Sequence, residues 1–259
     1  VSEVTLITND GTLGTKIEMK GGKLISDETV SANKGTKVTV KNLFFNTPAR
    51  LKFLKSYYTE LNGVIALIEK LALSHPKISF KLTADEKELI KTSGSNDLLK
   101  VIHEIYGYAV SKNMEYIKGS NLDYDIDGYV SNINVYKSTK KDMTTLVNGR
   151  IVTNQYLNKI IKDAYHTYLA ENKYPIVVIN INVDPTIVDV NIHPTKQDIK
   201  FSKMDTLEEL LFPLIRDKLK NINNIFKVEE ATINAYEEEY NEYSINNDFV
   251  VKEEEAKPF

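Results

Sequence analysis

Cysteine is absent from all 259 residues of the sequence. Its absence excludes disulfide bridges and any thiolate, whether as a metal ligand or as a nucleophile. The four histidines are His75, His103, His166 and His193, and no two of them have the i,i+4 spacing of a helical zinc site, so we expect no such site. A chain without cysteine fits the reducing cytosol, and we expect a cytoplasmic protein.

Long apolar runs are also missing. No stretch approaches the roughly 18 apolar residues that span a bilayer. The first residues, VSEVTLITND, alternate polar and apolar side chains without a basic leader. We therefore expect no membrane association and no signal peptide. The sequence starts within what reads as a strand and has no initiator methionine, so we expect it to be part of a longer protein that continues at both ends.

The common catalytic patterns are missing as well. The sequence contains no Walker motif, no GxSxG and no HExxH. Carboxylates are numerous, but a single sequence does not show which of them lie together. From the residues alone, the length and the 42% hydrophobic content indicate one or two globular domains and nothing about a reaction.

Charge is distributed unevenly along the chain. Residues 225–259 contain ten acidic residues and three lysines, a net −7, which leaves about +4 for residues 1–224 of the total −3. The segment Val30–Thr59 has no acidic residue and six basic ones: Lys34, Lys37, Lys41, Arg50, Lys52 and Lys55. Such a segment attracts polyanions, although a solvated surface is the commoner interpretation of a charge run.

Hydrophobic periodicity predicts an α+β fold. Alternation or dense β-branched runs predict strands at Val4–Thr8, Leu13–Lys20, Thr36–Leu43, Ile78–Leu82, Glu88–Lys91, Tyr124–Val130, Thr144–Val147, Tyr174–Val183 and Val188–Ile192. Helical spacing predicts helices at Glu60–Leu73, Asp97–Tyr106, Asn154–Ala170 and Leu207–Lys220. A further helix is expected to start at Pro48, with Asn46 or Thr47 as its cap.

Three regions are expected from these elements. The loop SGSN at 93–96 predicts a break between a first domain at 1–95 and a second at 96–222. Residues 223–259 have too few aliphatic side chains to offset the entropy of ordering. We expect them to form a disordered acidic linker.

The stretch GTKVTVKNLFFNTPARLKFLKS begins with Gly35 and Thr36. A hydroxyl beside backbone N–H groups at the start of a strand can bind phosphate oxygens. A plain turn before a strand explains the same pair. Further along, Lys52 and Lys55 are three residues apart, so on one helix they share a face and can follow a phosphate backbone. Alternatively, they lie over an apolar surface formed by their neighbours.

Arginine is scarce, with three residues against thirty lysines. A chain that uses lysine for generic positive charge retains arginine where its planar five-donor fork is needed. Arg50 lies in NTPAR and Arg150 follows the turn of LVNGR, whereas Arg216 lies in neither pattern.

The stretch DPTIVDVNIHPTKQDIKF breaks at a proline. Pro194 cannot donate to a sheet, and its fixed φ stiffens the loop that presents Lys196. A stiff loop loses less entropy when its lysine meets a ligand, and an ammonium group suits a terminal phosphate. By spacing alone, Lys196 is one surface lysine among many, and His193 is more simply a structural residue of the loop.

In this order, the patterns GT-x-V-x-V-x-NLFFNTPAR-x-KFLK, LVNGR and DVNIHPTKQDIKF resemble the MutL family of DNA mismatch-repair ATPases, over roughly residues 1–222. The resemblance implies the C-terminal part of a GHKL (Bergerat-type) ATPase sandwich, followed by a ribosomal-protein-like βαβ domain. It also implies that Gly35 and Thr36 lie near the phosphates of ATP. Lys196 then reaches the γ-phosphate from the second domain.

For DNA, the resemblance implies contacts by Arg50, Lys52, Lys55 and Arg150. Some members of the family carry further basic residues after NGR, whereas this chain reads IVTNQ, so no DNA contact is assigned to Gln155. The implied partners are DNA, a mismatch-recognition protein of the MutS type and a second copy of the complete protein.

The family's general-base glutamate, magnesium-binding asparagine, DxGxG motif and GFRGEAL loop have no counterpart in this sequence. The resemblance therefore implies ATP with Mg²⁺ in the complete protein, and we expect no cofactor to bind this chain alone. Two other functions stay open at this point. One is a non-catalytic DNA-binding or interaction module, and the other is a related GHKL machine such as a type II topoisomerase subunit.

Overall fold

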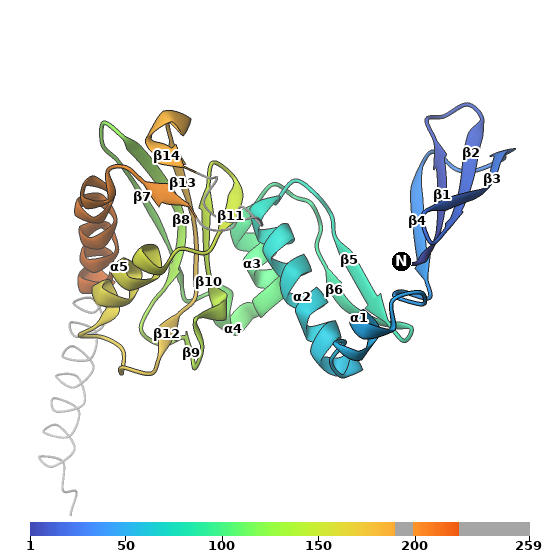
Figure 1. Cartoon of the computed structure of the whole chain (residues 1–259). Helices are drawn as coiled ribbons and strands as arrows, with labels where there is room; N and C mark the ends of the chain where they lie inside the picture. The colour runs from blue at the N-terminus through green and yellow to red at the C-terminus, as the bar shows by residue number, and fades with distance from the viewer. Residues whose placement is uncertain (190–198, 223–259) are drawn as a thin grey trace, which may run out of the picture. The chain divides into compact units, whose positions relative to one another are not determined.

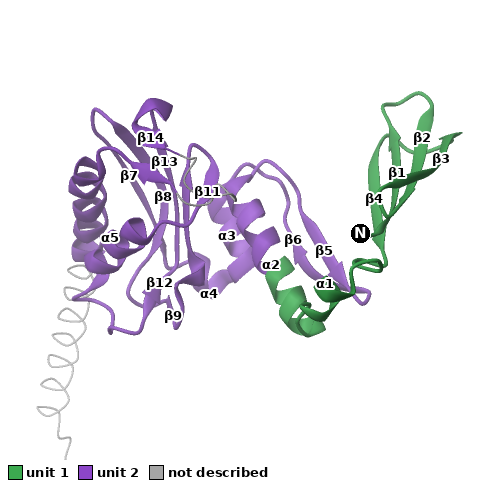
Figure 2. Cartoon of the chain, viewed as in Figure 1, with its two compact units in different colours: residues 1–64 green, residues 65–259 purple. Residues whose placement is uncertain are grey.

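The computed structural model describes residues 1–189 and 199–222 (Figure 1). The chain forms two compact units, Val1–Val64 and Ile65–Phe259 (Figure 2). The domain boundaries predicted at 95 and 222 were drawn from loops and from resemblance, and they stay predictions. Residues 223–259 and the C-terminal part of the expected strand Val188–Ile192 lie outside the described residues.

The first unit is built on a four-stranded antiparallel sheet in the order β3-β2-β1-β4. Its strands are β1 (Glu3–Asn9), β2 (Gly14–Lys20), β3 (Lys23–Val30) and β4 (Gly35–Lys41). The turn between β2 and β3 consists of Gly21 and Gly22, with φ of 58° and 88°. Two consecutive positive φ angles are what a two-residue hairpin turn of the right twist requires, and glycine adopts them without strain.

One face of this sheet is apolar and largely exposed. In the antiparallel register, Val4 pairs with Val40 and Leu6 with Val38, so the four side chains share a face. Val38 is 61% exposed and Val40 is 55% exposed. A sheet normally buries its apolar face against a second layer. The described residues of the unit therefore gain little stability from this face.

Two helices follow the sheet. The helix α1 (Pro48–Lys52) begins at Pro48, as expected, and Thr47 is its N-cap residue without a side-chain hydrogen bond. The helix α2 (Tyr57–Ser74) begins three residues before the predicted Glu60. The reason is a local cap: the Thr59 N–H donates to Ser56 Oγ (3.4 Å), and the Lys55 N–H donates to Glu60 Oε1 (2.9 Å).

The second unit contains a five-stranded sheet in the order β11-β10-β13-β8-β7. Strands β10 and β13 are parallel and the other neighbours are antiparallel. The helix α5 lies in the connection from β10 to β13, which makes this part a βαβ unit. The strands are β7 (Met114–Ser120), β8 (Tyr124–Ser131), β10 (Met143–Val147), β11 (Arg150–Val152) and β13 (Val177–Val183).

Smaller elements surround this sheet. They are the hairpin β5 (Lys81–Ala84) and β6 (Lys87–Lys91), the helices α3 (Leu98–Tyr106) and α4 (Tyr108–Ser111), and the strand pairs β9 (Tyr136–Lys137) with β12 (Tyr174–Pro175) and β14 (Val188–Asp189) with β15 (Lys200–Phe201). Short 3-10 turns occur at Lys140–Asp142 and Pro185–Ile187. Residues 204–222 are helical, which extends the predicted helix at Leu207–Lys220 in both directions. The predicted ranges did not include the strands β3, β7, β9, β11 and β15 or the helix α4.

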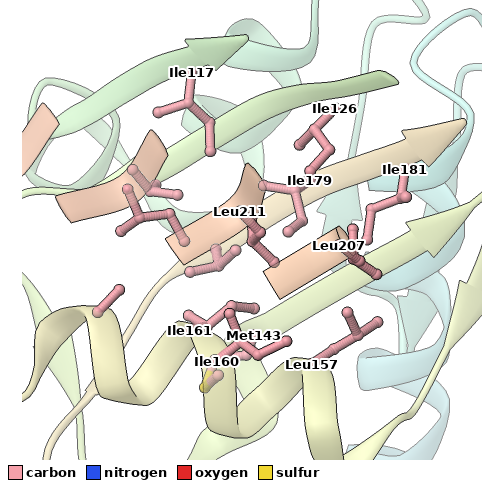
Figure 3. Close-up of a cluster of buried hydrophobic side chains, with 14 of the residues drawn as sticks. Ile117, Ile126, Met143, Leu157, Ile160, Ile161, Ile179, Ile181, Leu207 and Leu211 are labelled. Carbon is pink, nitrogen blue, oxygen red and sulfur yellow. The ribbon is translucent and has the colours of Figure 1, made fainter. Parts of the chain in front are cut away.

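Both faces of the five-stranded sheet are buried. Val177, Ile179 and Ile181 of β13 pack in one cluster with α5 and the helix at 204–222, which lie on the same side of the sheet (Figures 1 and 3). Val178, whose side chain points the other way, packs with Ala72 of α2 and with α3. A strand buried on both faces reads as a continuous β-branched run, which is why IVVININV was recognisable.

The helix α5 (Gln155–Tyr165) ends five residues before the predicted Ala170. After Tyr165 some hydrogen bonds join residues three positions apart, as where the Tyr168 N–H donates to the Tyr165 carbonyl (2.8 Å). The guanidinium of Arg216 donates to the Ala164 carbonyl (3.4 Å) and lies over the Tyr168 ring (5.2 Å). A cation that satisfies helix-end carbonyls stabilises the end at this place. The third arginine of the chain therefore has a structural role.

No helix in the described ranges combines the length and the hydropathy needed to cross a bilayer.

Glu69, a half-buried carboxyl group on α2, is expected to make the stability of the second unit depend on pH. Burial, and next the charge of Asp142, raise the pKa of Glu69, against the opposing charge of Lys137. The neighbouring Tyr106 phenol has a raised pKa, mainly because it is buried, and so it stays protonated at neutral and acidic pH. A carboxyl whose folded pKa is raised stabilises the fold below its unfolded pKa, and this contribution is lost as the pH rises through the folded value.

We therefore expect Glu69→Gln to raise the free energy of unfolding at pH 7, by an amount within about 0.5 kcal/mol. At pH near 4, around the unfolded pKa of glutamate, the variant and the wild type should be equal. Urea unfolding at the two pH values measures the difference. Glu209→Gln, which changes an exposed glutamate, is the control and should show no such trend. A stability gain that is the same at both pH values contradicts the assignment.

Candidate functional site

The basic side chains of Val30–Thr59 are exposed, and among them Lys41 lies opposite Glu3 in the β1–β4 register and helps to lower the pKa of that carboxyl. None of the six forms an ion pair with any residue that the structure describes. By contrast, two lysines of β2 in the same sheet are paired: Lys16 Nζ lies 2.8 Å from Glu18 Oε1, and Lys20 Nζ lies 2.7 Å from Glu3 Oε1. Unneutralised surface cations attract polyanions over a distance set by ionic strength.

The expectation that Lys52 and Lys55 share one helical face is wrong. The helix α1 ends at Lys52, and Lys55 lies in the link before α2, where its N–H donates to Glu60 Oε1. The cap of α2 requires this break in the helix. Phe53, between the two lysines, is 85% exposed. Arg50 and Lys52 therefore lie in α1 and Lys55 beyond its end, so the three cations do not form one helical stripe.

Gly35 and Thr36 lie at the start of β4, as expected. Gly35 has a φ of 129°, which favours glycine, and nothing lies within 4 Å of where its Cβ would stand. Thr36 pairs with Thr8 across the sheet, and their hydroxyl oxygens are 2.9 Å apart. Thr36 is exposed. The two hydroxyls and the open space beside the glycine backbone suit a bound oxyanion such as a phosphate.

The turn of LVNGR is fastened to the end of β13. Asn148 and Gly149 have φ of 49° and 76°, a two-residue turn between β10 and β11. The Asn148 side chain makes two bonds to one residue: Nδ2 donates to the Val183 carbonyl (2.9 Å), and Oδ1 accepts from the Val183 N–H (2.9 Å). The Gly149 N–H donates to Asn180 Oδ1 (3.1 Å). Arg150 therefore leaves a rigid turn.

Arg150 is the first residue of β11 and is exposed. It forms no ion pair within the described ranges. Beside it is a cavity of about 370 Å³ lined by Val147, Asn148, Arg150, Val152, Pro185, Val188 and Ile199. An exposed guanidinium at the edge of a mainly apolar hollow keeps its fork available for an external anion.

Asn154 lies two residues after the end of β11, and the sequence interpretation placed it only as the first residue of a helix. It is the N-cap of α5, and its Oδ1 accepts from the Tyr156 and Leu157 N–H groups (2.9 and 3.1 Å). Its Nδ2 donates to the Ile199 carbonyl (2.8 Å). The signal for the cap, an asparagine before an amphipathic run, was in the sequence. The bond to a residue 45 positions away was not.

Lys196, His193 and Pro194 lie outside the described residues. Thr36 belongs to the first unit and Arg150 to the second. The roles assigned to these residues therefore stay predictions. In the ranges 1–189 and 199–222, no three histidine, aspartate or glutamate side chains lie close enough together to hold a metal ion.

Comparison with known proteins identifies the family. Residues 102–220 match the family model described as DNA mismatch repair protein, C-terminal domain. The chain is 42% identical over 254 residues to the DNA mismatch repair protein MutL of Anoxybacillus flavithermus, which covers 98% of this chain and 41% of that protein. It is 41% identical to MutL of Bacillus cereus over 259 residues, which covers 100% of this chain and 39% of that protein. The chain belongs to the MutL family of DNA mismatch repair proteins. It spans about two fifths of the length of these relatives.

Solved structures of MutL proteins share the fold. The chain is 26% identical to the Aquifex aeolicus MutL ATPase domain complexed with ADP, with a TM-score of 0.60 over 71% of this chain and 69% of that one. The N-terminal domain of a DNA repair protein, at 23% identity, matches with a TM-score of 0.71 over 88% of this chain and 73% of that one. The predicted fold class is confirmed: an α+β chain that holds the C-terminal part of a GHKL sandwich and a ribosomal-protein-like βαβ domain.

Proposed function

We propose that the complete protein is an ATP-dependent coordinator that links mismatch recognition to strand removal. In this proposal the present chain supplies a DNA-binding surface and the phosphate-sensing Lys196. The observation that carries the proposal is the exposed, unpaired basic segment Val30–Thr59 within a chain of the MutL family.

Arg50, Lys52 and Lys55 of the first unit and Arg150 of the second are the proposed DNA-binding residues. All four side chains are exposed and have no carboxylate partner in the described part of the chain. Lysine and arginine on a surface neutralise backbone phosphates and release condensed counterions, which gives affinity without sequence preference. Arg150 differs from the other three because the turn before it is bonded to β13, which holds the backbone from which its two-donor guanidinium extends.

ATP is the proposed cofactor of the complete protein, since an Aquifex aeolicus MutL ATPase domain of similar fold is described as complexed with ADP. The exposed Thr36 hydroxyl at the glycine-started strand fits a phosphate oxygen, and the Lys196 ammonium fits the terminal one. When bound, ATP would supply a phosphoanhydride bond whose hydrolysis can change the conformation of the protein. Thr36 would donate a hydrogen bond to a phosphate oxygen, and Lys196 would neutralise charge on the terminal phosphate. No Mg²⁺ ligand is assigned among the described residues.

The proposed partners follow from membership of the family. They are DNA, a mismatch-recognition protein of the MutS type and a second copy of the complete protein, in the cytoplasm. We further propose that residues of the complete protein cover the apolar face formed by Val4, Leu6, Val38 and Val40.

The DNA-binding assignment predicts a change in salt dependence. We expect the double variant Lys52→Gln, Lys55→Gln to bind duplex DNA more weakly, with the slope of log K against log[salt] shallower by about 2, because each lost phosphate contact removes about 0.9. Fluorescence anisotropy of this chain over a series of salt concentrations measures the slope.

A matched pair of lysines in the same unit serves as the control. Lys16 and Lys20 are already neutralised by Glu18 and Glu3, so Lys16→Gln with Lys20→Gln should leave the slope nearly unchanged. Equal slopes for the two double variants would show that the basic segment is not the DNA-binding surface. If DNA binding follows the basic segment but ATP turnover of the complete protein does not depend on Lys196, the chain is a non-catalytic DNA-binding module.

A further inference from the structure

The strand that carries Arg150 is bounded by two asparagines. Asn148 precedes β11 and Asn154 follows it. Both side chains bond to the same later part of the chain, Asn148 to Val183 and Asn154 to Ile199. The residues that flank β11 are therefore bonded to the last residue of β13 and to the residue that precedes β15.

The Asn154 side chain is held in one orientation because its amide bonds to three backbone groups at once. Its oxygen accepts from the first two N–H groups of α5 at 2.9 and 3.1 Å, while its nitrogen donates to the Ile199 carbonyl at 2.8 Å. Asn154 is 7% exposed and Ile199 is 2% exposed. A rotation of the amide would leave buried polar groups without partners, so the geometry is strongly held.

Strand β15 begins immediately after Ile199. Lys200 and Phe201 pair with Asp189 and Val188 of β14, and the Ser202 N–H donates to the Ile187 carbonyl (3.0 Å). The hydrogen bond from Asn154 to the Ile199 carbonyl thus directly links a residue two positions after β11 to the residue before β15. These two elements are distant in sequence.

We infer that Asn154 is a positioning residue that transmits DNA binding at Arg150 to the β14–β15 pair. The inference rests on the proposed role of Arg150 in binding DNA. A phosphate held by the guanidinium restrains β11, and the Asn154 amide carries that restraint to the Ile199 carbonyl and so to the hydrogen bonds of β15. By linkage, the coupling acts equally in the other direction.

The test is hydrogen exchange of this 259-residue chain with and without a short DNA duplex. In the wild type, DNA should slow exchange at residues 199–202 by about 5-fold or more, the lower end of usual couplings between sites. Asn154→Ser keeps an acceptor that caps α5 but ends short of Ile199. In this variant the DNA-induced slowing should fall below about 2-fold, while DNA affinity stays within about 2-fold of the wild type.

The matched control is Asp97→Ser at the N-cap of α3, where Asp97 accepts from the Lys100 N–H (3.2 Å). It changes a helix cap of the same unit without touching Ile199, and the slowing should persist. Slowing that survives in Asn154→Ser, or a wild type without slowing, overturns the inference. A separate measurement distinguishes failure of the proposed function: if Arg150→Glu binds DNA as well as the wild type, the role of Arg150 is wrong and the inference falls with it.

Discussion

Gly128→Ala is expected to unfold the second unit. Gly128 is central in β8, paired with Ile117 on one side and Ile179 on the other. Its φ is 149°, and a Cβ at this position would lie 2.2 Å from the Val178 carbonyl oxygen and 2.7 Å from the Ile179 Cα. Both atoms are backbone of the buried strand β13, so neither can move without breaking the sheet.

We expect the loss in free energy of unfolding to exceed about 4 kcal/mol, the range of severe core mutations. Urea unfolding followed by circular dichroism measures it. Gly63→Ala is the matched control, because Gly63 lies within α2 with nothing within 4 Å of its Cβ position. That substitution should stabilise the helix by about 0.5–1 kcal/mol. A Gly128→Ala chain with nearly wild-type stability would show that β8 and β13 are not in the register described.

Lys196→Ala in the complete protein is expected to lower the turnover number for ATP by a factor on the order of 100, the usual loss when one preorganised donor to a reacting group is removed. The physical reason is that an ammonium group stabilises charge on the terminal phosphate more in the transition state than in the ground state. Steady-state kinetics over a range of ATP concentrations separates this effect from weaker binding, since a loss confined to KM would indicate a contact made equally in both states.

The control for this experiment is Lys200→Ala. Lys200 is an exposed residue of β15, four positions along the chain, and it forms no ion pair with the described residues. Its removal should leave turnover within about 2-fold of the wild type, as surface substitutions away from special features usually do. If Lys196→Ala and Lys200→Ala behave alike, Lys196 does not sense the nucleotide.

The sequence predicted those elements whose cause is local. The run IVVININV identified β13 because burial on both faces selects β-branched residues, and Asp97 caps α3, which runs over Leu98–Tyr106, almost as predicted. The patterns around Thr36, Arg150 and Lys196 together identified the family. The errors were at ends decided elsewhere: α5 stops early at a turn supported by Arg216, which is 52 residues from Ala164.

What the sequence determined by itself is the composition of the candidate surfaces: a basic segment without acids, a glycine–threonine strand start and an arginine after an Asn-Gly turn. Only the tertiary structure decided which cations are left unpaired, that Lys52 and Lys55 are separated by a helix end, and that Asn148 and Asn154 bond to Val183 and Ile199. The physical reason is range. Turn, cap and strand preferences act over a few residues, whereas ion pairs and buried amide bonds join groups that meet only once the sheet has formed.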